Sequence, residues 1–385
     1  MDPSTPPELR SMETCPAGDD PTAVALLRGL VEIPSLSRHE AAAVDWLVDA
    51  FRQLGYGHAF RDGAGNAVGI RECPSPQGNI TETGILLGHI DTVPGEIPVR
   101  FDGDRLYGRG SVDAKGSLAA FVVAVARAQP QPGQRWIVVG AVEEECPTSA
   151  GARFVAEQFQ PDWCIIGEPS GATAVTLGYK GRLQILADWV QASAHSAGPR
   201  TAVAERGVAW WLRLRLWAEH WNQSRTKLFE QLQVSLEEFV TSSDGLQDRA
   251  RLRASLRLPV DFPLTEFSAE FGPGVRTVCD DGEFSCEIQH VGLELAHQEP
   301  RTSPLVQRFN RVFRQAGWAP RHKLKTGTSD MNVVAPRWQC PIIAYGPGDS
   351  SLDHTPHEHL EISEYLSAIR ILQAVLEHPG FSPPG

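Results

Sequence analysis

Acidic and imidazole side chains follow the apolar runs of this sequence or stand between them. They are His89 and Asp91 after residues 84–89, Glu143, Glu144 and Glu145 after 136–142, Glu168 after 163–166, His354 after 341–345, and Asp113 before a predicted helix. The strands of a parallel sheet place such residues together at their carboxyl ends. Six carboxylates and two imidazoles in one cleft would repel one another unless cations neutralised them. The pattern therefore predicts a site for two metal ions.

The residue types indicate which ions these are. Mixed histidine and carboxylate shells suit zinc, cobalt or manganese, whereas shells made only of oxygen suit magnesium or calcium. Zinc is the first expectation, with cobalt as an alternative. Asp91 stands two residues after His89, where its carboxylate could accept the second imidazole N–H and fix the tautomer. Taken singly, each of these residues is more often a structural or solvated feature than a functional one.

Two other kinds of site are disfavoured. Gly108-Arg109-Gly110 has Asp113 where a dinucleotide-binding loop needs its third glycine. Ser111 and Ser170 lack the flanking glycines of a serine hydrolase nucleophile. Neither a phosphate-binding loop nor a nucleophilic serine is predicted.

The elements that must position these side chains alternate along the chain. Short apolar runs predict strands at 84–89, 136–142, 163–166 and 341–345, and helical spacing predicts helices at 115–128, 151–158 and 363–376. This alternation favours an α/β fold, with a mostly parallel sheet and helices on both faces. We expect a metal-binding catalytic domain at 21–175 and 289–378, an inserted smaller α+β lid or dimerisation domain at 176–288, and a disordered tail at 1–20.

Composition limits the partners and the compartment. The 385 residues carry a formal net charge of -12, which disfavours binding to nucleic acid. No apolar stretch is long enough to span a membrane and no signal peptide is recognisable, so we expect a cytoplasmic protein. The 7 cysteines form no C-x-x-C pair, which predicts free thiols rather than a thiolate zinc site.

Five short strings resemble those of the M20 metallopeptidases and deacylases, a family that includes acetylornithine deacetylase and succinyl-diaminopimelate desuccinylase. They are GHIDTVP at 88–94, GRGSVDAKG at 108–116, EE at 144–145, GEPS at 167–170 and HTPHE at 354–358. The likeness covers roughly residues 22–377. It implies a two-domain hydrolase with two divalent metal ions. Asp113 would bridge both ions, His89 and Glu168 would hold one, and Glu145 and His354 would hold the other.

The likeness also implies that Glu144 is the general base, which takes a proton from an activated water and delivers it to the leaving amine. Glu143 makes this register ambiguous, although the spacing to Gly151 favours Glu144 as base and Glu145 as ligand. His357 and His359 compete with His354. The family pattern favours His354 because it places a glutamate four residues later, here Glu358.

Residues outside the metal site receive roles from the same resemblance. His195 resembles a histidine of the inserted domain that reaches the neighbouring subunit's site and stabilises the oxyanion, which implies a homodimer. Arg257 matches an arginine that pairs with a substrate carboxylate, and Gly327, Thr328 and Ser329 could donate to the same end of the substrate. Each of these residues could instead have a structural role.

Longer strings are similar to a narrower branch of the family. They are LGYKGRL at 177–183, KLKTGTSDMNV at 323–333 and YGPGDSSLDHTP at 345–356. That branch releases lysine, or ornithine, from the terminal glutamate of an amino-group carrier protein in lysine and arginine biosynthesis. The alternatives are an acetylornithine or acetyl-lysine deacetylase acting on a small acylated amino acid, an M20 dipeptidase, and a noncatalytic member that only binds metal or ligand.

An acidic carrier protein would need a basic surface on this chain. Basic residues cluster at 213–215, 249–257 and 321–325. These clusters could equally be ordinary solvated faces, so the sequence alone leaves the carrier's contact surface open.

Overall fold

The computed structural model describes residues 20–195, 197–273 and 284–378. The chain divides into two compact units, of which the first is Met1–Gly178, Glu299–Lys323 and Ser329–Gly385, and the second is Tyr179–Gln298 with Leu324–Thr328. The predicted tail lies outside the described residues except for Asp20, whose carboxylate caps the first helix by accepting the Ala23 N–H at 3.2 Å. The assignment of the second unit as a lid or dimerisation domain stays a prediction.

The main sheet of the first unit has a parallel centre and antiparallel edges. Its order is β1-β2-β6-β3-β7-β15-β8, and β6, β3, β7 and β15 are neighbours in parallel. The bounds are β1 His58–Arg61, β2 Ala67–Cys73, β3 Glu82–His89, β6 Gln134–Ala141, β7 Trp163–Gly167, β8 Ala174–Tyr179 and β15 Ile342–Ala344. The predicted α/β class with a mostly parallel sheet is confirmed. The antiparallel strands β1, β2 and β8 are additions that the sequence did not predict.

The central strands are apolar on both faces because both faces are covered. Ile85, Leu86 and Leu87 are successive residues of β3 and all have 0% exposure, as expected for a strand between two layers of helices. Leu86 packs in the same core as Leu118 and Phe121 of helix α3 (Lys115–Arg127). Every residue of α3 from 115 to 125 is buried, so this helix is apolar around most of its circumference.

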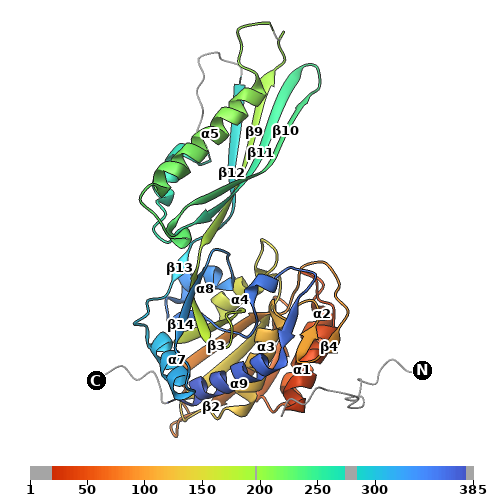
Figure 1. Cartoon of the computed structure of the whole chain (residues 1–385), viewed down its shortest axis with the longest axis vertical. Coiled ribbons are helices and arrows are strands. Elements are labelled where there is room, and N and C mark those ends of the chain that lie inside the picture. Colours follow the sequence, from red (N-terminus) through yellow and green to blue (C-terminus); the bar gives the residue numbers. More distant parts are fainter. Residues whose placement is uncertain (1–19, 196, 274–283, 379–385) are drawn as a thin grey trace, which may run out of the picture. The chain divides into compact units, whose positions relative to one another are not determined.

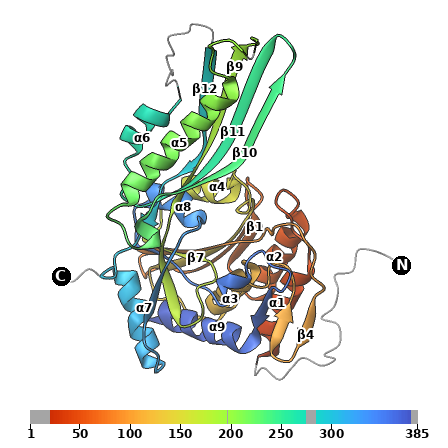
Figure 2. The same ribbon diagram turned by 45° about the horizontal axis from the view of Figure 1, so that its top comes forward.

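The helices of the first unit form two groups about the sheet. Helix α3 contacts α1 and α9, whereas α4 contacts α8, and the ribbon in Figure 2 shows the two groups on opposite sides of the sheet. The helix bounds are α1 Pro21–Glu32, α2 Ala41–Gln53, α4 Ala150–Gln158, α7 Pro304–Gln315, α8 Asp330–Trp338 and α9 Ile362–Glu377. A small antiparallel sheet in the order β16-β5-β4 completes the unit, with bounds β4 Arg100–Asp102, β5 Arg105–Tyr107 and β16 His359–Glu361.

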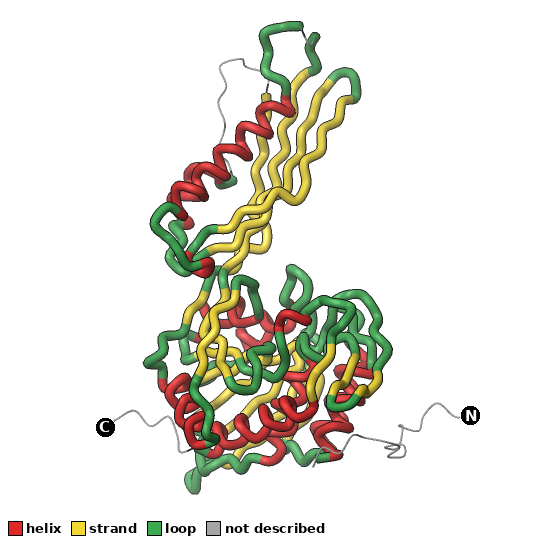
Figure 3. The backbone as a smooth tube through the Cα atoms, in the orientation of Figure 1, coloured by secondary structure: helices red, strands yellow, loops and turns green. Residues whose placement is uncertain are grey.

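The second unit is an antiparallel sheet covered on one face by a long helix. The sheet order is β10-β11-β9-β12, and α5 (Val203–Asn222) lies along it (Figures 1 and 3). Trp210 and Phe267 are buried in the core of this unit, and Trp217 packs against that core. These tryptophans therefore serve the unit's own packing. The strand and helix bounds are β9 Gly181–Ala192, β10 Gln233–Ser243, β11 Gln247–Leu258, β12 Phe284–Glu294 and α6 Leu264–Phe271.

The remaining described elements are short. They are β13 His297–Gln298, β14 Arg321–Lys325 and two 3-10 turns, η1 Leu228–Glu230 and η2 Ser350–Leu352. Within the described ranges, no helix combines the length and the apolar character that crossing a bilayer requires. The cysteines at 73, 146, 164 and 340 are free, and those at 15 and 279 lie outside the described residues.

Candidate metal centre

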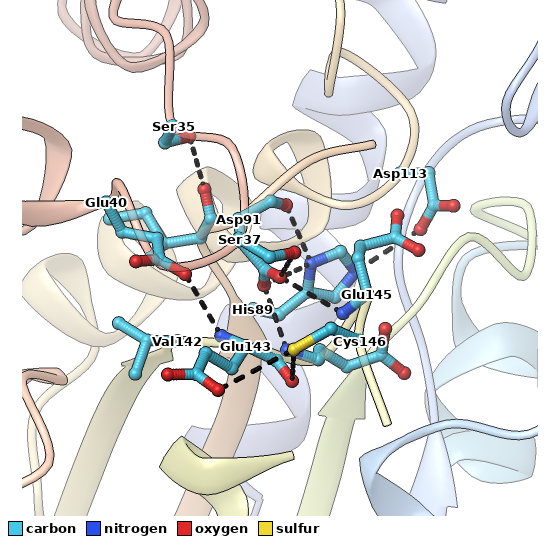
Figure 4. Close-up of polar contacts among 12 residues, drawn as sticks. Ser35, Ser37, Glu40, His89, Asp91, Asp113, Val142, Glu143, Glu145 and Cys146 are labelled. Carbon is cyan, nitrogen blue, oxygen red and sulfur yellow. Dashed lines mark hydrogen bonds and ion pairs between the residues drawn. The ribbon is translucent and has the colours of Figure 1, made fainter. Parts of the chain in front are cut away.

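His89 ends β3 at the carboxyl edge of the sheet, where its imidazole is buried. Its Nδ1 lies 3.0 Å from the backbone carbonyl oxygen of Asp91. A carbonyl only accepts, so Nδ1 donates this hydrogen bond, and in the neutral ring the lone pair lies on Nε2. Nε2 faces Asp113 Oδ1 at 3.3 Å and Glu168 Oε1 at 3.9 Å. Figure 4 shows the ring between Asp91 and Asp113.

The carboxylate of Asp91, which was predicted to orient the His89 ring, mainly holds the loop of Glu144 and Glu145. Its Oδ1 is 3.5 Å from His89 Nδ1, farther than the backbone carbonyl that orients the ring. Its two oxygens instead accept the backbone N–H groups of Glu144 at 3.1 Å and Glu145 at 3.0 Å, and the hydroxyl of Ser37 at 2.7 Å. Asp91 is fully buried, so these bonds fix the loop that carries the two glutamates.

Asp113 lies between the two imidazoles. It precedes α3, and its Oδ1 faces His89 Nε2 at 3.3 Å while its Oδ2 faces His354 Nε2 at 3.1 Å. Glu145 Oε1 also lies 3.1 Å from His354 Nε2. The side chain of His354 is 52% exposed, so this edge of the cluster is open to solvent. A carboxylate between two histidines is arranged as a shared ligand of two ions would be.

Glu143 points to other partners. Its carboxylate accepts a hydrogen bond from the Thr148 hydroxyl and lies 3.7 Å from Arg38 Nε. Its backbone N–H donates to Glu40 Oε1 at 3.2 Å. These contacts occupy the Glu143 side chain away from the imidazoles, which favours Glu145 as the ligand in this loop.

The carboxylates around them raise the pKa of both imidazoles. Asp113 and Glu145 raise the pKa of His354 to about 10. Burial lowers the pKa of His89, but Asp113, Asp91 and the charge of Glu144 together raise it, and the net result lies well above its ordinary value. A cation that binds the Nε2 atom of either histidine would have to displace a proton from it.

The donor set fits a pair of divalent cations. Among the described residues, one ligand atom each from His89, Asp113 and Glu145 lie within 4.8 Å of one another. Burial raises the pKa of Glu144 well above its ordinary value, and the charges of Asp330 and Glu168 raise it further although the charge of His89 lowers it. Imidazole and carboxylate donors suit zinc or cobalt. The residues that would hold the ions are His89, Asp113, Glu145, Glu168 and His354.

The residues predicted to bind substrate belong mostly to the second unit. Arg257 lies on β11, and its Nη1 donates to Thr328 Oγ1 at 3.3 Å. His195 Nδ1 accepts the backbone N–H of Ala197 at 3.1 Å. Ser329 belongs to the first unit and caps α8, since its hydroxyl accepts the Met331 N–H at 3.2 Å. Its hydroxyl therefore has a structural partner.

The same predicted group includes Gly327, which lies in the second unit beside Thr328. The space beside the Gly327 Cα is open, since no atom other than those of its chain neighbours lies within 4 Å of a Cβ built there. The roles of these residues in substrate binding stay predictions.

Sequence reasoning missed three residues that hold the ligand loops. Ser37 and Glu40 lie in a polar run between two helices, which gave no signal of chemistry, yet they bind Asp91 and the Glu143 backbone. From the sequence, Glu358 was used only to favour His354 over the histidines at 357 and 359. Its buried carboxylate in fact accepts the Asp113 N–H at 3.1 Å. Buried acceptors of backbone N–H groups cannot be recognised without coordinates.

The sequence is similar to proteins of known family and name. The profile of peptidase family M20/M25/M40 matches residues 85–378. A relative from Deinococcus radiodurans, named LysW-lysine hydrolase, is 42% identical over 367 residues, which is 94% of this chain and 98% of the relative. A relative from Thermococcus kodakarensis, named putative LysW-lysine/LysW-ornithine hydrolase, is 38% identical over 92% of this chain and 91% of its own.

Solved structures share the fold at lower identity. Aminopeptidase PepT from Bacillus cereus superimposes with a TM-score of 0.71 at 17% identity, covering 92% of this chain and 97% of its own. The YXEP protein of Bacillus subtilis, described as a dinuclear metal-binding peptidase, has a TM-score of 0.63 at 12% identity, with coverage of 92% and 97%. These likenesses establish the architecture alone.

Proposed function

The chain belongs to peptidase family M20/M25/M40 and is an amide hydrolase, and we propose that it releases lysine from the terminal glutamate of an amino-group carrier protein. The observation that carries this proposal is the 42% identity over 94% of the chain to a relative named for that substrate. Ornithine is the expected second substrate, since the Thermococcus kodakarensis relative is named for both amino acids. That the protein works in the cytoplasm stays a prediction.

The chemistry is assigned to the cluster at the carboxyl edge of the main sheet. A bound pair of divalent cations, zinc or cobalt, supplies Lewis acidity to the scissile carbonyl and makes a water molecule more acidic. Glu144 takes the proton of that water and passes it to the leaving amine. Asp91 keeps this base in place, because its Oδ1 accepts the Glu144 backbone N–H at 3.1 Å.

Substrate recognition is assigned mostly to residues of the second unit. Arg257 presents a planar guanidinium suited to a carboxylate, and its bond to Thr328 orients it. Gly327 precedes Thr328 and would offer its backbone N–H to the same carboxylate, whereas the Ser329 N–H already donates to Asn332 Oδ1 at 2.9 Å. His195 is the proposed oxyanion donor.

We propose a homodimer, so that His195 acts in the partner's site. Val208, Leu212 and Leu216 recur every fourth residue on α5 with 45%, 50% and 64% exposure. Such an exposed apolar stripe on a helix favours a protein contact. Leu216→Glu should yield monomers in sedimentation and lower turnover, whereas a dimeric and fully active Leu216→Glu would exclude this surface.

The substrate is tested by comparing three compounds: carrier bearing lysine on its terminal glutamate, acetyl-lysine and acetylornithine. We expect a higher kcat/KM for the carrier, falling as salt is added, because the basic residues at 321–325 would attract an acidic protein despite the net negative charge of the chain. Equal rates with no salt effect would instead identify a deacetylase of small amino acids.

A further inference from the structure

Two loops of the metal centre start from one short ladder. Strands β5 and β16 pair antiparallel, with Tyr107 opposite His359 and Arg105 opposite Glu361. Beyond Tyr107 the chain runs to Asp113, and before His359 it comes from His354. The ladder ends before either ligand, so something else must set their separation.

A buried carboxylate lies at that point. Glu358 has 0% exposure, and its Oε1 accepts the backbone N–H groups of Val112 at 2.9 Å and Asp113 at 3.1 Å. Its Oε2 accepts from Arg109 Nη1 at 2.8 Å. A residue four positions after His354 thus holds the backbone of Asp113.

Arg109 joins a third segment to the pair. Its Nε donates to the carbonyl of Gly95 at 2.9 Å, and the Nη1 that binds Glu358 also donates to the carbonyl of Thr355 at 3.3 Å. Thr355 follows His354, whose φ is 60°. A non-glycine residue in this left-handed region keeps its conformation only when its surroundings fix it, and Arg109 is one of the groups that do so.

Stability alone does not account for such a pair. A buried ion pair is often no more stabilising than apolar side chains of the same volume, because both charges lose water. The geometric consequence is more specific. The pair ties the loop of Asp113 to the loop of His354, and it leaves both of those side chains directed at each other, at 3.1 Å.

We propose that Arg109 and Glu358 are positioning residues that set the separation of Asp113 and His354, and thereby the affinity for the ion held by Asp113, Glu145 and His354. The proposal rests on the metal centre described above and not on the identity of the substrate. Its test therefore reads metal binding, and an unexpected substrate would leave it unaffected.

The experiment titrates the metal-free full-length protein with Co²⁺ and follows heat and visible absorption. Arg109→Lys keeps the charge but cannot reach three acceptors. Glu358→Gln keeps the shape but offers one acceptor oxygen where two are used. The matched control is Arg105→Gln, which removes the exposed ion pair to Glu361, at 3.6 Å, on the same ladder.

We expect both variants to bind one Co²⁺ with the affinity of the parent protein. They should bind the second Co²⁺ about 10-fold to 100-fold more weakly, because loss of the groups that support a metal ligand weakens metal binding by that factor. The absorption bands of the second ion should change, while the thermal midpoint of the metal-free variants stays near that of the control. Unchanged affinity for both ions would overturn the proposal. So would an equal loss in Arg105→Gln, or an Arg109→Lys protein that does not fold, since the pair would then serve the fold.

Discussion

Two regions of this molecule are rich in charged residues, but only one of them has an excess of negative charge. At the edge of the main sheet, carboxylates outnumber the imidazoles they surround, and Asp113 and Glu145 both lie 3.1 Å from His354 Nε2. On the open face of the second unit's sheet, arginines alternate with acids across the strands. Arg249 lies 3.4 Å from Asp188, and Arg253 lies 3.2 Å from Glu237.

The comparison separates charge that needs a ligand from charge that is already balanced. The arginines on β11 form one of the basic clusters that the sequence offered as a contact surface for an acidic carrier. The structure pairs two of them with carboxylates on the neighbouring strands. An acidic partner would find little net charge there, whereas the first region retains an excess of negative charge that divalent cations can neutralise.

Replacing the proposed base should have the largest effect. Glu144→Gln removes the proton carrier but no proposed ligand, so turnover should fall by about 10²-fold to 10⁴-fold while two ions stay bound. Steady-state kinetics with metal analysis measures both quantities. The matched control is Glu143→Gln, which should remain active because Thr148 and Arg38 occupy that side chain. An active Glu144→Gln variant together with an inactive Glu143→Gln variant would identify Glu143, and not Glu144, as the base.

The affinity of the first region for metal should depend on pH. With its pKa raised to about 10, His354 is protonated at neutral pH in the metal-free protein, and a cation needs the neutral ring. Affinity should therefore rise with pH, by about tenfold per unit for each proton released, until pH passes that pKa. Calorimetry in buffers of different ionisation enthalpy counts the protons. Binding at pH 7 without proton release would contradict the assignment of His354.

Changes on the balanced face should have the smallest effect. Arg253→Gln removes contacts to Glu237 and Glu238, and exposed cross-strand pairs of this kind contribute about 0.2–1 kcal/mol. Urea unfolding should show a loss in that range, with turnover of carrier-linked lysine unchanged. A loss of activity on the carrier that spares acetyl-lysine would mean that this face contacts the carrier after all.

The fold could be predicted where periodicity and burial agree. Apolar runs such as 84–89 and 163–166 are strands because helices cover both their faces. The antiparallel strands β1 and β2 escaped prediction because half-exposed strands carry weaker patterns, whereas the short strand β8 escaped prediction although it is fully buried.

The candidate site could also be predicted only in part. Side chains placed after successive strands were predicted to converge, and the structure brings His89, Asp113, Glu145 and His354 together. The hydrogen bonds that hold their loops could not be predicted, because Glu40 and Glu358 act on backbone groups far away in sequence.

The most direct test of the metal centre is the stoichiometry of metal binding. Metal-free protein titrated with Zn²⁺ or Co²⁺ should bind two ions per chain, and Asp113→Asn should weaken both, because Asp113 lies between the two imidazoles. Binding of a single ion, or two ions bound equally well by Asp113→Asn, would contradict the account.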